Sequence, residues 1–141
     1  MIKRIAHVSI AVKDLGFSKE LFSKLLGNEF PHGEKIESQN AEVSFYPVGE
    51  SSIELIQAID ASGAGSAITT FIGKRGEGIH HICLEVDDIE KEMQRLTNLG
   101  FQFASKAPLP GGDGCLVAFI HPKSANGVLV ELSQRISSKQ A

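Results

Sequence analysis

Two stretches of this sequence repeat each other: residues 79–89 read IHHICLEVDDI, and residues 5–15 read IAHVSIAVKDL. Both have an apolar residue two positions before a histidine. A run with a large apolar residue at every second position follows, and then an acidic residue that can start a helix. The two histidines, His7 and His81, lie 74 positions apart. The ends of the two copies also match, since SIELIQ at 52–57 resembles LVELSQ at 129–134. Self-similarity at a fixed period predicts two copies of one structural unit.

Each copy predicts the order strand, helix and then three strands, because alternating runs favour strands and Leu-Gly suits the end of a helix. The first copy predicts strands over 4–12, 30–36, 41–48 and 52–58, with a helix over 17–27. The second predicts strands over 79–86, 101–105, 115–121 and 127–134, with a helix over 88–99. We therefore expect one α+β domain over 1–141, made of module 1 (about 1–60) and module 2 (about 77–141). Between them, 61–76 holds a glycine-rich linker at 61–65 and a short helix over 66–74.

The composition is that of a globular protein without a nucleic-acid or membrane surface. Hydrophobic residues make up 42% and charged residues 22%, and the net charge of −3 argues against binding to nucleic acid or anionic lipid. No apolar run reaches membrane-spanning length, and no apolar secretion signal follows Met1. We expect a cytoplasmic protein whose two cysteines, Cys83 and Cys115, are reduced thiols.

Four polar residues fall at matching positions of the two copies. Side chains alternate between the faces of a strand, so each copy offers one histidine from its first strand and one glutamate from its last. These are His7 and Glu54, then His81 and Glu131. The same alternation predicts that Glu42 shares their face. Polar residues often only line the wet side of a sheet, but two imidazoles and two carboxylates repeated in register favour a site for a divalent first-row metal ion.

Several motifs resemble those of the methylmalonyl-CoA epimerases, within the vicinal-oxygen-chelate (glyoxalase/bleomycin-resistance) superfamily. They are HVSIAV at 7–12, GIHHIC at 78–83 followed by VDDI at 86–89, and FIHPKS at 119–124 leading into GVLVEL at 127–132. The resemblance covers nearly the whole chain. It implies a glyoxalase-like fold, in which paired βαβββ modules form a curved mixed sheet around a metal-binding cleft. It also implies that His7, Glu54, His81 and Glu131 are the metal ligands.

The implied reaction interconverts (2R)- and (2S)-methylmalonyl-CoA by metal-assisted 1,1-proton transfer through an enolate. The catalytic pair we expect is Glu131, which is also a ligand, on one side of C2 and Glu42 on the other. A water on the metal or Glu54 is the alternative second proton donor. Co²⁺ is the expected ion, and Mn²⁺, Ni²⁺ or Zn²⁺ would also accept this ligand set. The resemblance further implies an acyl-CoA substrate and a homodimer.

Two other functions fit the same scaffold, because a fold alone does not specify a reaction. One is a lactoylglutathione lyase with the same four ligands, and the other is a non-catalytic, ligand-binding resistance protein. Three further features have open roles. We expect His80 to be a packed histidine, His121 to cap a turn or contact substrate, and the Gly/Pro-rich loop at 108–114 to be a lid or a plain connection.

Overall fold

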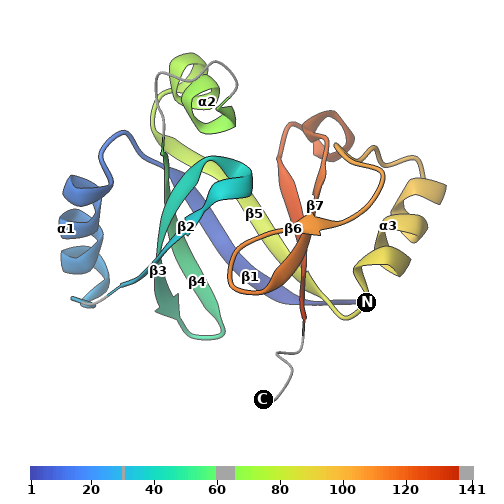
Figure 1. Ribbon diagram of the computed structural model, residues 1–141, viewed down its shortest axis with the longest axis horizontal. Coiled ribbons are helices and arrows are strands. Elements are labelled where there is room, and N and C mark those ends of the chain that lie inside the picture. The colour runs from blue at the N-terminus through green and yellow to red at the C-terminus, as the bar shows by residue number, and fades with distance from the viewer. Residues whose placement is uncertain (30, 60–65, 137–141) are drawn as a thin grey trace. The chain divides into compact units, whose positions relative to one another are not determined.

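The computed structural model describes residues 1–29, 31–59 and 66–136. The chain divides into two compact units (Figure 1). We call residues 7–80 the first unit, and residues 81–141 together with 1–6 the second unit. Strand β1 contributes to both, because its residues 2–6 belong to the second unit and its remaining residues to the first.

The described elements follow the predicted order of two βαβββ modules joined by a helix, which confirms the α+β class. The first module runs through β1 (Ile2–Ala11), α1 (Leu15–Leu26), β2 (His32–Ile36), β3 (Ala41–Val48) and β4 (Ser51–Ala58), with a 3₁₀ turn at Glu37–Gln39. The joining helix is α2 (Ala67–Arg75). The second module runs through β5 (Gly78–Val86), α3 (Ile89–Asn98), β6 (Leu109–Pro110), β7 (Cys115–Ile120) and β8 (Val130–Arg135), with a 3₁₀ turn at Pro122–Ala125. The linker expected at 61–65 lies outside the described residues.

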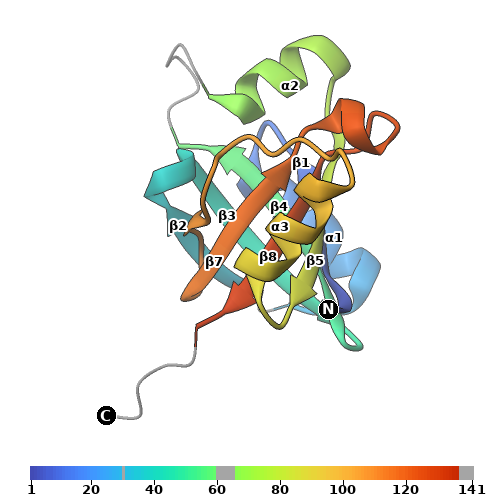
Figure 2. The same cartoon turned by 90° about the vertical axis from the view of Figure 1, so that its right-hand side faces the viewer.

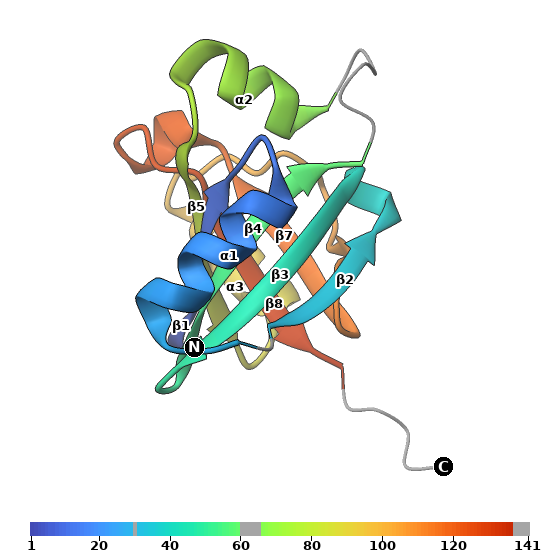
Figure 3. The ribbon, with the colours of Figure 1, turned by 90° about the vertical axis from the view of Figure 1, so that its left-hand side faces the viewer.

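In the first unit the strand order is β2-β3-β4-β1. Strands β1 and β4 are parallel, and the other two pairs are antiparallel, so the sheet is mixed. Helix α1 packs on β3 and β4 (Figure 3). Between this helix and the sheet lies a core of Val12, Leu15, Tyr46 and Leu55, all buried. This core takes one face of each strand and leaves the other face to a second set of side chains.

The second unit repeats this arrangement with the order β5-β8-β7-β6. Strands β5 and β8 are parallel, while β7 is antiparallel to β8 and to the short β6. Helix α3 packs on β7 and β8 (Figure 2). Its buried residues Ile89, Met93 and Leu96 meet Val86 and Leu132 of the sheet.

The repeated sequence ends have a structural reason, because each copy anchors its helix start twice. In the first unit the Asp14 carboxylate accepts a hydrogen bond from the amide of Phe17, and the Gln57 side chain accepts one from the amide of Leu15. In the second unit Asp88 accepts from Lys91, and Gln134 accepts from Ile89. The first amides of a helix lack partners inside it, so these acceptors stabilise the helix start and bind it to the last strand of its module.

The strand predicted at 101–105 is wrong. Only Phe103 forms an isolated bridge, to Ile120, and β6 lies later, at Leu109–Pro110. Phe101 and Phe103 pack against the α3 core, as two residues on one strand face would, but pairing with β7 is limited to the hydrogen bonds from Ala104 N to Phe119 O and from His121 N to Gln102 O. The loop at 108–114 is a hairpin closed by two backbone hydrogen bonds. The Gly111 amide donates to the carbonyl of Cys115, and the Cys115 amide donates to the carbonyl of Gly112.

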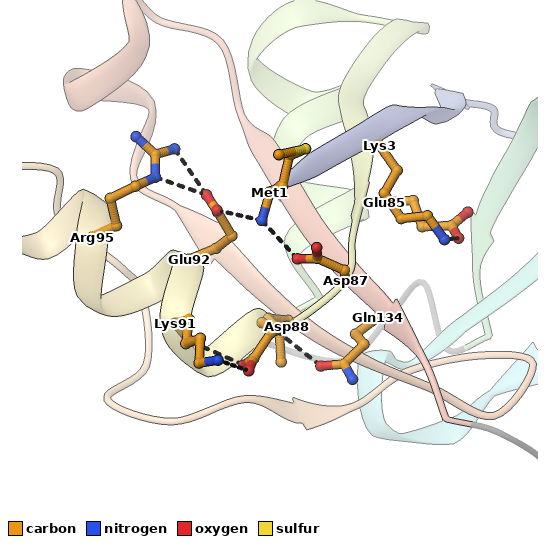
Figure 4. A network of polar contacts seen from close by, with 10 residues as sticks. Met1, Lys3, Glu85, Asp87, Asp88, Lys91, Glu92, Arg95 and Gln134 are labelled. Carbon is orange, nitrogen blue, oxygen red and sulfur yellow. Dashed lines mark hydrogen bonds and ion pairs between the residues drawn. The ribbon is translucent and has the colours of Figure 1, made fainter.

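A charge network joins the start of the chain to α3 within the second unit (Figure 4). The Met1 ammonium lies 2.6 Å from Asp87 and 2.7 Å from the buried carboxylate of Glu92, which also accepts two hydrogen bonds from Arg95. Hydrogen bonds from Arg95 and from the Met1 ammonium hold the pKa of Glu92 below its usual value. The same ammonium lowers the pKa of Asp87, and its own pKa is raised by the two carboxylates.

Among the described residues, the helices are too short or too polar for any of them to span a membrane.

Candidate functional site

In the first unit, the parallel pairing of β1 and β4 brings His7 and Glu54 together. Their register places Ser9 opposite Glu54, so that His7, Ser9 and Glu54 share one face of the sheet. His7 Nε2 lies 3.6 Å from Glu54 Oε2, and the Glu54 side chain is 4% exposed. Phe45, the partner of Glu54 on β3, presents its ring to the edge of the His7 ring at 5.8 Å. A histidine and a carboxylate are therefore held close together in a largely buried position.

The second unit builds the same group from β5 and β8. His81 Nε2 lies 2.8 Å from Glu131 Oε2, and both side chains are buried, at 2% and 7% exposure. Phe119, the partner of Glu131 on β7, meets the His81 ring edge-on, again at 5.8 Å. Each copy thus provides one His, one Glu and one Phe in the same strand positions. Phe45 and Phe119 were not among the predicted site residues, although they are separated by the same 74 positions as the histidines.

The chemistry of these pairs fits a divalent metal ion. Neutral imidazole nitrogens and carboxylate oxygens are ligands for Co²⁺, Mn²⁺, Ni²⁺ and Zn²⁺. A carboxylate is costly to bury without a charged or hydrogen-bonding partner, so the burial of both Glu54 and Glu131, each beside a histidine, is unusual as plain core structure. The phenylalanine rings beside each histidine restrict how the imidazole can turn, which orients the nitrogen that faces the carboxylate.

The prediction that Glu42 shares the face of this site is wrong. In the continuous register of β3 with β4, Glu42 pairs with Gln57, whereas Glu54 pairs with Phe45. Glu54 and Gln57 are three residues apart on one strand, so they point to opposite faces. Glu42 therefore lies on the face that carries α1, and Val43 occupies the face of Glu54.

The face of Glu42 could not be predicted from the sequence because β3 is buried on both sides. Val43 and Tyr46 are both 0% exposed, yet they belong to opposite faces. A strand with apolar residues on both faces has no clear alternation, and a one-residue error exchanges the faces. Only pairing with β4 decides which residues point where.

Other predicted residues have local roles. Cys83 is buried and in register with Glu131, and its thiol donates to Ser133 Oγ at 3.3 Å. His80 is half-buried, and its ring packs edge-on against Phe71 of α2 at 4.9 Å, as expected of a packed histidine. His121 Nδ1 accepts a hydrogen bond from the amide of Lys123, which confirms a turn-capping role. Both Cys83 and Cys115 are free thiols, as predicted.

The chain is similar to known proteins over almost its full length. It is 39% identical over 136 residues to the ethylmalonyl-CoA/methylmalonyl-CoA epimerase of Cereibacter sphaeroides, covering 95% of this chain and 99% of that protein. It is 33% identical over 133 residues to an uncharacterized protein of Bacillus subtilis, covering 94% and 93%. Among solved structures, a Streptomyces coelicolor methylmalonyl-CoA epimerase variant in complex with 2-nitronate-propionyl-CoA matches with a TM-score of 0.88 and 27% identity, over 97% of this chain and 100% of that one.

The family comparison agrees with the architecture. Residues 6–119 match the family model described as Glyoxalase/Bleomycin resistance protein/Dioxygenase superfamily, a segment that includes His7, Glu54 and His81. The glyoxalase-like fold expected from the sequence is thereby confirmed. The chain belongs to the glyoxalase/bleomycin resistance protein/dioxygenase superfamily.

Proposed function

We propose that this protein is a metal-dependent epimerase of methylmalonyl-CoA. The single observation that carries the proposal is the repeated pair of a histidine with a buried glutamate, in a chain 39% identical to an ethylmalonyl-CoA/methylmalonyl-CoA epimerase over nearly its whole length. The solved complex with 2-nitronate-propionyl-CoA supports an acyl-CoA thioester as the substrate class. A homodimer and a cytoplasmic location remain predictions from the resemblance and the sequence.

The metal ligands we propose are His7, Glu54, His81 and Glu131. The donor set supports this assignment, since each unit contributes one imidazole and one carboxylate from strands of identical register. When bound, a divalent ion would supply Lewis-acid stabilisation of the negative charge that develops on the thioester oxygen. The ion we expect is Co²⁺, with Mn²⁺, Ni²⁺ and Zn²⁺ as alternatives that the same ligands accept.

Glu131 is the residue we propose to transfer the proton on one face of C2 of the substrate, while a second group transfers a proton on the opposite face. A carboxylate can act as a general base toward this carbon, because the adjacent thioester and carboxylate make the C2 proton acidic. Burial keeps bulk water from competing for the proton. With Glu42 on the other face of β3, the groups left for the second proton transfer are Glu54 and water.

The test is hydrogen exchange at C2. The purified protein is incubated with (2R)- or (2S)-methylmalonyl-CoA in D₂O, and proton NMR follows exchange while a stereospecific coupled assay follows configuration. The same reactions are run after EDTA treatment and after Co²⁺ is restored, and ethylmalonyl-CoA is tested in parallel. We expect exchange and loss of configuration that disappear with EDTA and return with Co²⁺.

Other results would replace the proposal. Turnover of the methylglyoxal–glutathione hemithioacetal without any exchange at C2 would make the protein a lactoylglutathione lyase. Inactivity toward both substrates would overturn the epimerase assignment and favour a ligand-binding role. Exchange that survives complete metal removal would refute the metal dependence while keeping the reaction.

A further inference from the structure

Within the first unit, Glu54 has a second close partner besides His7. The Ser9 hydroxyl donates a hydrogen bond of 2.7 Å to Glu54 Oε1. Both residues are buried, at 0% and 3% exposure, and they are register partners on the parallel strands β1 and β4. A buried hydroxyl almost always has a partner, and a bond to an ionised carboxylate is stronger than one between neutral groups.

This bond distinguishes the two oxygens of Glu54. Oε1 is held by Ser9, whereas Oε2 lies on the side of His7, 3.6 Å from Nε2. The last torsion of a glutamate side chain is otherwise broad, so the carboxylate could turn freely without such a partner. The Ser9 bond therefore selects which oxygen faces the imidazole.

The second unit has a different residue at the matching position. Cys83 lies 74 positions after Ser9 and is the register partner of Glu131. A thiol is a weak donor compared with a hydroxyl, and the Cys83 thiol donates to Ser133. The two glutamates thus stand opposite side chains of different donor strength, although their strands are equivalent.

We propose that Ser9 is a positioning residue, which holds Glu54 so that it binds a divalent cation through Oε2 alone. This inference rests on the metal site of the proposed function. Hydrogen-bond partners of metal ligands commonly orient the ligand and tune its affinity. In this arrangement Glu54 serves as a fixed ligand, which leaves Glu131 and water for the two proton transfers.

The test measures Co²⁺ binding directly, by calorimetric titration and by the visible absorption of the bound ion. Ser9→Ala is expected to weaken Co²⁺ binding by about 10- to 100-fold and to change the absorption spectrum. The matched control is Ser44→Ala, which removes another buried serine hydroxyl from the same unit, on the opposite sheet face. Ser44→Ala is expected to leave Co²⁺ affinity and spectrum unchanged, and circular dichroism checks that each variant folds.

A double-mutant cycle then separates an effect through Glu54 from a general structural effect. In a Glu54→Ala background, Ser9→Ala is expected to cause no further loss of Co²⁺ affinity. The positioning role would be overturned if Ser9→Ala lowered Co²⁺ affinity by the same factor in both backgrounds, or if Ser9→Ala alone kept the wild-type affinity. A wild-type protein that binds no Co²⁺ would instead overturn the proposed metal site itself, a result distinct from the first two.

Discussion

At the scale of single residues, the site is two copies of one trio. A histidine, a glutamate and a phenylalanine occupy equivalent strand positions in each unit, with the ring centroids of His and Phe 5.8 Å apart in both. The copies differ at one neighbouring position: Ser9 donates a hydrogen bond to Glu54, whereas Cys83 is the register partner of Glu131. Under the proposed function, this difference accompanies the use of Glu54 as a ligand and of Glu131 as a base.

Replacing Glu131 by Gln should abolish proton transfer, because an amide cannot accept the C2 proton. We expect the exchange rate at C2 to fall by at least about 100-fold, the usual contribution of a general base. The matched control is Glu42→Gln, which should leave the rate near wild type since Glu42 lies on the α1 face. NMR exchange in D₂O measures both. Equal losses in the two variants would show that the assignment of faces is wrong.

Replacing Glu54 by Gln tests its role as a ligand. The amide keeps an oxygen for the metal, and its NH₂ can donate to Ser9 Oγ, so the geometry should persist. We expect the exchange rate at C2 to stay within about tenfold of wild type. A loss of this size is at the low end of what changes around a metal ligand usually cause. A loss as deep as that of Glu131→Gln, with Co²⁺ still bound, would instead identify Glu54 as the second proton-transfer group.

At the scale of elements, each module binds its helix to its last strand through one glutamine. The Gln57 side chain accepts from the Leu15 amide, and Gln134 does the same for Ile89. Gln57→Ala and Gln134→Ala should each lower the free energy of unfolding by about 1 kcal/mol, the usual net value of such a bond. Gln94→Ala, at an exposed position of α3, should change it by less than about 0.5 kcal/mol. Urea unfolding measures all three, and equal effects would contradict the anchoring role.

The start of α3 should be sensitive to acid through Glu92. Its pKa is lowered by Arg95 and the Met1 ammonium, so the folded state gains stability while Glu92 is ionised, above its usual value of 4.5. That stability is lost as the pH falls through the lower folded-state pKa. Arg95→Met should therefore destabilise the protein at neutral pH, and the difference from wild type should shrink as the pH falls below about 4.

Arg135→Met is the control for this pH effect. Arg135 pairs with Asp113 at 3.4 Å, and both side chains are more than half exposed. Loss of this ion pair should therefore change the free energy of unfolding little. Unfolding of both variants is followed by urea titration between pH 3 and pH 7. A difference between Arg95→Met and wild type that is constant over this range would exclude the ion pair as its cause.

At the scale of the whole molecule, the proposal makes stability depend on the metal. An ion that binds only the folded chain raises the free energy of unfolding by mass action, by about 2.7 kcal/mol when it is present at 100 times its Kd. Removing metal with EDTA should therefore lower the Tm, and Co²⁺ should restore it. His81→Ala, which removes one proposed ligand, should reduce this Co²⁺-dependent rise, whereas Ser44→Ala should retain it. A Tm that is the same with EDTA and with Co²⁺ would contradict the proposed metal site.

The amino-acid sequence alone predicted the repeat, the order of the elements and the strand positions of the histidines and glutamates. It could do so because β1, β4, β5 and β8 each show residues that differ in polarity from one face to the other, and because the same pattern occurs twice. Tertiary pairing was needed to assign the face of Glu42, since β3 is buried on both sides and its alternation is ambiguous. It also decided that 101–105 is not a strand and that Ser9 reaches Glu54, because register between strands depends on pairing with residues far away in the chain.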